Sequence, residues 1–207
     1  EPILSGNDLP LVTIVTPSFN MAHYIEETIE SVLSQNYPRI EYFVMDGGSR
    51  DGTLEILRRY RGRLRYVSQP DHGPGDAVNR GFSMGRGSIF AWLNADDTYL
   101  PGAVSAAIEY LLAHPQADVV YGEGLWIDAA GRTIAPYPTK NFDSDLLQRE
   151  CFICQPACFL RSEAFRDSGM LNPALQYAFD YDLWIRISKR FRFERISVPL
   201  ATSRMHS

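Results

Sequence analysis

The sequence has 207 residues, of which 45% are hydrophobic and 22% are charged, a balance typical of a globular protein. Its formal net charge of −5 argues against non-specific binding to nucleic acid or to an anionic membrane surface. No stretch approaches the roughly 20 consecutive apolar residues that span a bilayer, and no signal-peptide pattern opens the chain. We therefore expect no nucleic-acid partner and no transmembrane segment in this chain.

The first half of the chain alternates strands with helices. Apolar runs predict strands over residues 11–16, 40–45, 64–69 and 88–94. Helical spacing of apolar residues follows each run and predicts helices over 22–35, 51–60, 75–85 and 101–115. Because the strands are continuously apolar, they are typical of a parallel sheet that is covered on both faces. We predict an α/β fold with a Rossmann-like, mostly parallel sheet flanked by helices.

The second half of the chain is more mixed. A hairpin is predicted over residues 118–138, followed by further elements: a short helix over 143–150, a strand and helix over 156–169, an amphipathic helix over 179–191 and a final strand over 193–205. No internal repeat or linker separates the halves. We predict a single domain over residues 1–207, with a nucleotide-binding half at about 10–116 and a smaller mixed half at about 117–207.

Three cysteines, Cys151, Cys154 and Cys158, lie close together in the second half. Such spacing can bind a metal ion, but the nearby sequence offers no fourth ligand and the neighbouring residues are largely apolar. We interpret these residues as buried thiols of a protein in a reducing compartment.

Polar residues follow three of the predicted strands, at 17–20, 46–49 and 94–97. Ligands of open parallel sheets bind beyond the carboxyl ends of the strands, so these segments are expected to converge on one crevice. Asp96 and Asp97 are adjacent carboxylates, which suit Mg²⁺ or Mn²⁺ bound to phosphates. A solvated turn is the structural alternative. Dinucleotide redox chemistry and P-loop hydrolysis are disfavoured, because no G-x-G-x-x-G follows a strand and no G-x-x-x-x-G-K-[ST] occurs.

Five segments occur in a fixed order along the chain: TIVTPSFN, VMDGGSRDGT, DAVNRG, WLNADD and FDYDLWIR. Together they resemble glycosyltransferase family 2, whose members are inverting enzymes with a GT-A fold. The likeness runs from about Pro10 to Met205 and includes the subgroup patterns DGGS and LNxDD. It implies a GT-A fold in which the mixed half, about 117–207, lies on the acceptor side.

The resemblance implies a nucleotide-diphosphate sugar as donor, with a UDP-sugar expected. The backbone of Pro17 and the ring of Phe19 would lie against the base, which Asp46 would also contact, and Asp96 would meet ribose or sugar. The family's donor pocket further implies Asp76 and Asn79, for which a capped short helix is the alternative. The chain departs from many members at Gly47, where a second aspartate is common.

The resemblance also implies a metal ion, Mn²⁺ or Mg²⁺, held on the diphosphate by Asp97. The Arg-x-His pattern near the end of the chain adds His206 at the metal or diphosphate, with a disordered tail as the alternative. Asp180 would be the base that deprotonates the acceptor, while Asp182 resembles a helix residue. Gln155 would line the acceptor side. The implied reaction is displacement of the nucleoside diphosphate with inversion at the anomeric carbon.

Two other functions stay open from the sequence. Phe179 stands where the family usually has a glutamate before the base, which fits a degenerate, non-catalytic nucleotide-sugar-binding module. A nucleotidyltransferase is less favoured, because the loop after the first strand lacks a glycine-rich, basic phosphate-binding pattern. An active member is expected to transfer sugar to a glycan or lipid-linked acceptor in bacterial surface glycan synthesis. Its expected place is the cytoplasm or the inner face of the membrane.

Overall fold

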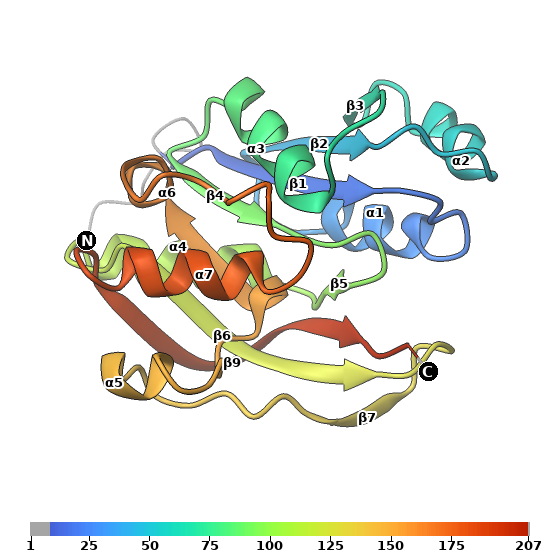
Figure 1. Ribbon diagram of the computed structural model, residues 1–207. Helices are drawn as coiled ribbons and strands as arrows, with labels where there is room; N and C mark the ends of the chain where they lie inside the picture. The colour runs from blue at the N-terminus through green and yellow to red at the C-terminus, as the bar shows by residue number, and fades with distance from the viewer. Residues whose placement is uncertain (1–8, 207) are drawn as a thin grey trace.

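Nine strands form one sheet across residues 9–206, the part of the chain that the computed structural model describes (Figure 1). Four of them run parallel in the order β3-β2-β1-β4, with the bounds β1 (Val12–Ser18), β2 (Ile40–Asp46), β3 (Arg65–Ser68) and β4 (Ile89–Trp92). Their carboxyl ends lie at one edge of the sheet, on the right in Figure 1. The parallel sheet predicted for the first half is therefore confirmed.

The second half extends the same sheet with strands of mixed direction. β8 (Cys158–Arg161) runs antiparallel to both β4 and β6 (Val119–Ile127). β9 (Phe193–Arg204) lies parallel to β6 and pairs on its other side with the short β5 (Thr98–Tyr99). β7 (Thr133–Pro136) forms the predicted hairpin with β6. β9 ends at the same side of the molecule as β1 and β4 (Figure 1), so the last residues return to the edge where the polar loops gather.

Helices cover both faces of this sheet. α1 (Ile25–Leu33), α2 (Thr53–Arg59) and α4 (Ala103–Ala113) pack on one face, and α3 (Pro74–Met84), α6 (Ser162–Asp167) and α7 (Phe179–Ile187) pack on the other. The short α5 (Ser144–Leu147) and the 3-10 helix η1 (Gln155–Ala157) belong to the second half. No helix among residues 9–206 is long and apolar enough to cross a membrane.

The hydrophobic core has two parts, one on each face of the sheet. Successive side chains of a strand point to opposite faces, so Ile14 joins the core under α1 and α4 whereas Val15 joins the core under α3 and α7. In the second core the ring of Trp184 from α7 stacks on Trp92 of β4 at a centroid distance of 5.3 Å. Trp184 is therefore a packing residue that fixes α7 against the sheet.

The start of α2 differs slightly from the prediction. The helix begins at Thr53 rather than at Asp51. Asp51 precedes it and accepts hydrogen bonds from the amide of Thr53 at 2.9 Å and from the amide of Ala22 at 3.0 Å. The carboxylate thus caps α2 and at the same time fastens the loop before α1, which is why the helix starts after it.

Gly81 allows α3 to approach β1 closely. A Cβ atom at this position would lie 2.6 Å from Cγ1 of Val15 and 3.1 Å from Cγ of Met45, both of them buried. Real Cβ atoms do not come so close to a neighbour, so any larger residue must push the helix away from the sheet. The close contact also sets the height of the loop that leads into α3.

We expect Gly81→Ala to lower the free energy of unfolding by about 1–3 kcal/mol, because overpacking against the stiff Val15 outweighs the roughly 1 kcal/mol gain in helix propensity. Urea unfolding followed by circular dichroism measures the difference. Ser83→Ala, on the exposed side of the same helix, is the matched control and should change stability by less than about 0.5 kcal/mol. A more stable Gly81→Ala protein would contradict the close packing.

Candidate active site

Hydrogen bonds join the loops that follow β1 and β2 at the carboxyl edge of the sheet. The amide of Gly47 donates to the carbonyl of Ser18 at 2.8 Å. The amide of Asn20 donates to the Ser49 hydroxyl at 2.7 Å, and the Asn20 side chain accepts from the amide of Arg50 at 2.8 Å. The predicted convergence of these two strand ends is therefore confirmed. The Ser18 hydroxyl is buried and has no hydrogen-bond partner among residues 9–206.

Asp46 shapes the loop after β2. Its side chain is buried, and Oδ2 accepts hydrogen bonds from the amides of Gly48 and Ser49 at 3.1 and 3.0 Å and from the Ser68 hydroxyl at 2.6 Å. Oδ1 accepts from the Ser49 hydroxyl. The carboxylate is therefore occupied by its own chain, and its predicted contact with a nucleotide base stays a prediction.

Three other residues lie around this donor-side loop. Phe19 follows β1 with 57% of its surface exposed, so its ring is open to a ligand. Pro17 is buried inside β1, opposite Met45 of β2, which leaves only its backbone for a contact. Asp71 approaches Gly47 so closely that a Cβ there would lie 2.8 Å from Oδ2 of Asp71. A carboxylate from another loop thus lies beside the position where many family members carry a second aspartate.

Asp76 and Asn79 both stabilise α3 and its surroundings. Asp76 accepts from the amide of His72 at 3.1 Å and lies 4.0 Å from the guanidinium of Arg80. The Asn79 side chain donates to the carbonyl of Leu171 at 2.8 Å and accepts from the amide of Leu171 at 3.1 Å. Asn79 therefore clamps the segment before α7 onto α3 with both ends of its amide group. The donor-binding roles of both residues stay predictions.

The two aspartates after β4 differ in their surroundings. Asp97 is buried, and its Oδ1 accepts from the amide of Arg204 at 2.8 Å while its Oδ2 accepts from the Asn94 side chain at 3.2 Å. Asp96 is more open, and its Oδ2 lies 2.6 Å from Nε2 of His206. Asp96, Asp97 and His206 thus lie at one corner of the molecule. Their roles at a metal ion or a donor stay predictions.

Arg204 ties this corner of the molecule together. Only 1% of its side chain is exposed. Its Nε donates to the carbonyl of Asp96 at 2.8 Å, and its two terminal nitrogens reach the carbonyl of Asp128 at 3.0 Å and the carboxylate of Glu27 at 2.6 Å. The guanidinium also lies over the ring of Tyr24, at 4.7 Å from its centroid. One buried cation therefore links α1, the loop after β4 and the turn between β6 and β7.

The acidic pair fits a divalent metal ion. Burial, together with the neighbouring Asp96 carboxylate, raises the pKa of Asp97 to about 8, so a bound cation would favour the doubly ionised pair. Among residues 9–206, no group of three or more His, Cys, Asp and Glu side chains could hold a metal by itself. The Asp96 and Asp97 carboxylates suit Mn²⁺ or Mg²⁺ that completes its coordination with phosphate oxygens and water.

Asp180 lines a cavity of about 270 Å³ together with Asn94, Asp97 and Gln155. Burial raises the pKa of Asp180 above its usual value, against the opposing effect of hydrogen bonds from backbone amides at the start of α7. Gln155 donates to the carbonyl of Trp92 at 2.7 Å and accepts from Asn94 at 3.4 Å. The structure therefore brings the predicted base, the predicted acceptor-side residue and Asp97 into one cavity.

The start of α7 carries backbone strain beside this cavity. Ala178 precedes the helix with φ of 55°, in the left-handed region that a residue with a side chain rarely adopts. Phe179 packs against the core between the sheet and α7. Asp182 faces away from the cavity residues and pairs with Arg186 at 2.8 Å, so it serves the helix, as predicted.

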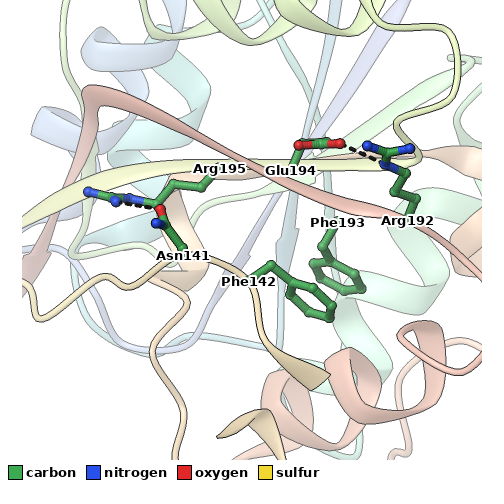
Figure 2. A pocket seen from close by; sticks show the side chains of 6 residues that line it. All are labelled: Asn141, Phe142, Arg192, Phe193, Glu194 and Arg195. Atoms are coloured by element: carbon green, nitrogen blue, oxygen red, sulfur yellow. Dashed lines mark hydrogen bonds and ion pairs between the residues drawn. The ribbon is translucent and has the colours of Figure 1, made fainter. Parts of the chain in front are cut away.

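A second and larger cavity, of about 410 Å³, lies at the start of β9, at the opposite end of this strand from Arg204 (Figure 2). Its lining residues are Asn141, Phe142, Arg192, Phe193, Glu194 and Arg195. Arg192 pairs with Glu194 at 2.6 Å, and Arg195 donates to Asn141 at 2.8 Å (Figure 2). About 12 residues of β9, or roughly 35 Å, separate Phe193 from Arg204. Because its charges are paired and it is remote from the acidic pair, this cavity is not the candidate active site.

Sequence analysis missed several residues of the site. Arg204 belongs to the Arg-x-His pattern, so its position was visible, but its burial and its contact with Asp96 depend on the return of β9. Tyr177 and Tyr137 both line the cavity with Asp180. Tyr177 lies three residues before Asp180 in the sequence, which could have indicated it, whereas no local pattern indicates Tyr137.

Solved structures with the same arrangement of elements are GT-A glycosyltransferases. The structure of Staphylococcus aureus TarS in complex with UDP-GlcNAc superposes with a TM-score of 0.77 at 19% identity, over 95% of this chain and 59% of that one. The mannosyltransferase PcManGT of Pyrobaculum calidifontis, in complex with GDP-Man and Mn²⁺, superposes with a TM-score of 0.72 at 19% identity, over 96% of this chain and 58% of that one. The GT-A fold is therefore confirmed.

The chain is also similar in sequence to curated glycosyltransferases. An uncharacterized glycosyltransferase of Rickettsia felis is 32% identical over 213 residues, which cover 96% of this chain and 35% of the relative. The chondroitin synthase of Escherichia coli is 29% identical over 196 residues, which cover 91% of this chain and 28% of the relative. This chain thus spans about a third of the length of these two relatives. The family model described as Glycosyl transferase family 2 matches residues 13–169, and the chain belongs to that family.

Proposed function

We propose that the protein transfers a sugar from a nucleotide-diphosphate sugar, with UDP as the expected nucleotide, to an acceptor hydroxyl. The observation that carries the proposal is the cavity at the carboxyl ends of the strands, which Asp180 and Asp97 line together. Membership of the family supports it, as do the nucleotide sugars in the two solved structures with the same fold. A degenerate binding module or a nucleotidyltransferase would not need a base in this cavity.

The donor would bind along the loops after β1 and β2. The open ring of Phe19 offers a face for the base. Gly47 leaves its backbone accessible beside the Asp71 carboxylate. Asp46 would act mainly by holding these loops in shape, and Asp76 and Asn79 by fixing α3 beneath them.

The acidic pair, Asp96 and Asp97, would hold Mn²⁺ or Mg²⁺ at the diphosphate, with the His206 imidazole beside them. When bound, such a metal supplies positive charge near the departing nucleoside diphosphate. Arg204 keeps the Asp96 backbone and the Asp97 carboxylate in place, so this chain contributes a rigid acidic corner. The Mn²⁺ in the PcManGT structure supports the choice of metal.

Asp180 would accept the proton of the acceptor hydroxyl while its oxygen attacks the anomeric carbon. Attack from the side opposite the leaving group breaks the bond to the diphosphate and inverts the anomeric centre. The raised pKa of Asp180 makes this carboxylate a stronger base than a solvated aspartate. An acceptor in bacterial surface glycan synthesis, a glycan or a lipid-linked saccharide met at the cytoplasmic face of the membrane, is part of the proposal. The name of the Escherichia coli relative supports that class of product.

UDP binding is expected to require the metal and the acidic pair. In calorimetric titrations, Asp96→Asn and His206→Ala should weaken UDP binding in Mn²⁺ by about 10–100-fold, the size of effect found when metal sites lose supporting groups. EDTA should remove the difference between these variants and wild type. Asp145→Asn, on the exposed α5, is the charge-matched control. UDP binding that is unchanged by EDTA and by either substitution would contradict the metal site.

Asp180→Asn is expected to lower the turnover number by about 10²–10⁴-fold, because the amide cannot accept the proton. The dissociation constant for UDP should stay within about twofold of that of wild type. Donor consumption is followed by UDP release with a panel of UDP- and GDP-sugars in Mn²⁺. Asp182→Asn, whose side chain serves Arg186, is the control. Equal turnover by Asp180→Asn and wild type would remove Asp180 from the mechanism, and UDP binding without turnover in wild type would favour the degenerate binding module.

We expect activity to be lost on acidification at a higher pH than it would be if the base had the pKa of an ordinary aspartate. The base must be ionised, and burial raises the pKa of Asp180, so kcat/KM should decrease as pH falls through that raised pKa and level off above it. Measuring kcat/KM over a series of pH values at saturating metal tests this decrease. The residual activity of Asp180→Asn should not decrease in this way, and an unchanged pH profile in that variant would assign the titration to another group.

A further inference from the structure

Tyr177 is the most exposed large side chain on the rim of the candidate active site. It has 88% of its surface in contact with solvent and lines the same cavity as Asp180. It directly precedes Ala178, whose left-handed φ of 55° opens α7. A residue with a side chain keeps such a backbone only where the surroundings enforce it. The conformation fixes the direction of Tyr177 relative to the helix that carries the base.

The segment that leads to Tyr177 is fastened to the helices on either side of it in the sequence. Asn79 of α3 holds Leu171 by two hydrogen bonds, of 2.8 and 3.1 Å. Arg186 of α7 donates to the carbonyl of the preceding residue, Met170, at 2.6 Å. Gln176, directly before Tyr177, reaches the carbonyl of His72 at 3.5 Å. These contacts place the backbone that carries Tyr177 at the rim of the cavity, with its ring open to a ligand.

The rest of the cavity provides groups for a polyhydroxylated ligand. Asn94, Gln155 and Ser203 line it with amide and hydroxyl groups. Tyr137 enters from the segment after β7 and packs edge-on against Trp126 at a centroid distance of 5.3 Å. Aromatic rings and neutral polar groups in one cavity match the apolar CH face and the hydroxyls of a sugar ring.

The charge of the cavity restricts the kind of sugar. Asp97 and Asp180 line it, and none of the described residues that line it is a lysine, arginine or histidine. A uronic acid ring would bring a third carboxylate into this space without a basic side chain to meet it, and like charges at short range disfavour binding. The lining therefore favours a neutral sugar ring.

We propose that Tyr177 is the stacking platform for the acceptor and that the acceptor is a saccharide whose terminal ring is neutral. The proposal rests on the proposed function, because it assigns the acceptor subsite of the same cavity. The CH face of the ring lies on Tyr177, its hydroxyls meet the amides of Asn94 and Gln155, and the attacking hydroxyl points to Asp180. The substrate class is thus a glycan end with an uncharged residue.

Direct binding tests this assignment without any need for turnover. Saturation-transfer NMR on the full chain, with a panel of disaccharide methyl glycosides ending in glucose, galactose, N-acetylglucosamine or glucuronic acid, should detect the neutral ends with strongest saturation on ring CH protons. Tyr177→Ala should weaken that binding about tenfold, whereas Tyr177→Phe, which keeps the ring, should bind like wild type. Ile134→Ala, an exposed apolar residue on β7, is the control.

The outcomes separate this proposal from the proposed function. Equal saccharide binding by wild type and Tyr177→Ala, tighter binding of the glucuronic acid end, or no saccharide binding at all would overturn the Tyr177 assignment. UDP binding in Mn²⁺ by wild type is measured in parallel as the readout of the proposed function. Failure of wild type to bind UDP would instead overturn the proposed function, while the saccharide titration would still decide the role of Tyr177.

Discussion

The buried guanidinium of Arg204 is the interaction on which the geometry of the site depends. A cation with 1% of its side chain exposed needs partners for its donors, and it finds them in the Glu27 carboxylate and in carbonyls of Asp96 and Asp128. Its own amide also supports the Asp97 carboxylate. Because these partners come from separate elements, the corner forms only when the whole sheet has closed. Removing one partner would leave a buried charge without compensation.

The mixed second half of the sheet brings Arg204 to its partners. β9 runs parallel to β6 and ends beside the loop after β4, which delivers Arg204 and then His206 to the acidic pair. The same half supplies α7, anchored by the stack of Trp184 on Trp92, and so brings Asp180 to the cavity. In the proposed function, the parallel half would supply the loops for a donor, and the mixed half would supply His206, the base Asp180 and the rim of the cavity.

The sequence places Asp46, Asp76 and Asn79 near the site but does not define their roles. Each directs polar atoms to its own chain, and its predicted place at the donor stays a prediction. An aspartate after a strand looks the same in the sequence whether it meets a ligand or three backbone amides. The choice between these roles depends on loops that are distant in sequence, and no local pattern records it.

What the sequence by itself determined is the order of strands and helices, the parallel half of the sheet, the polar strand ends and the family. These depend on local periodicity and on short segments in a fixed order, so they are readable without coordinates. Only the tertiary structure decided that His206 meets Asp96 rather than Asp97, that Asn79 is occupied by Leu171, and that Tyr177 stands open beside Asp180. The physical reason is that each of these depends on which side chains and surfaces come together across the fold. His206 and Asp96 are 110 residues apart in the chain, and only the packing of the complete sheet makes them neighbours.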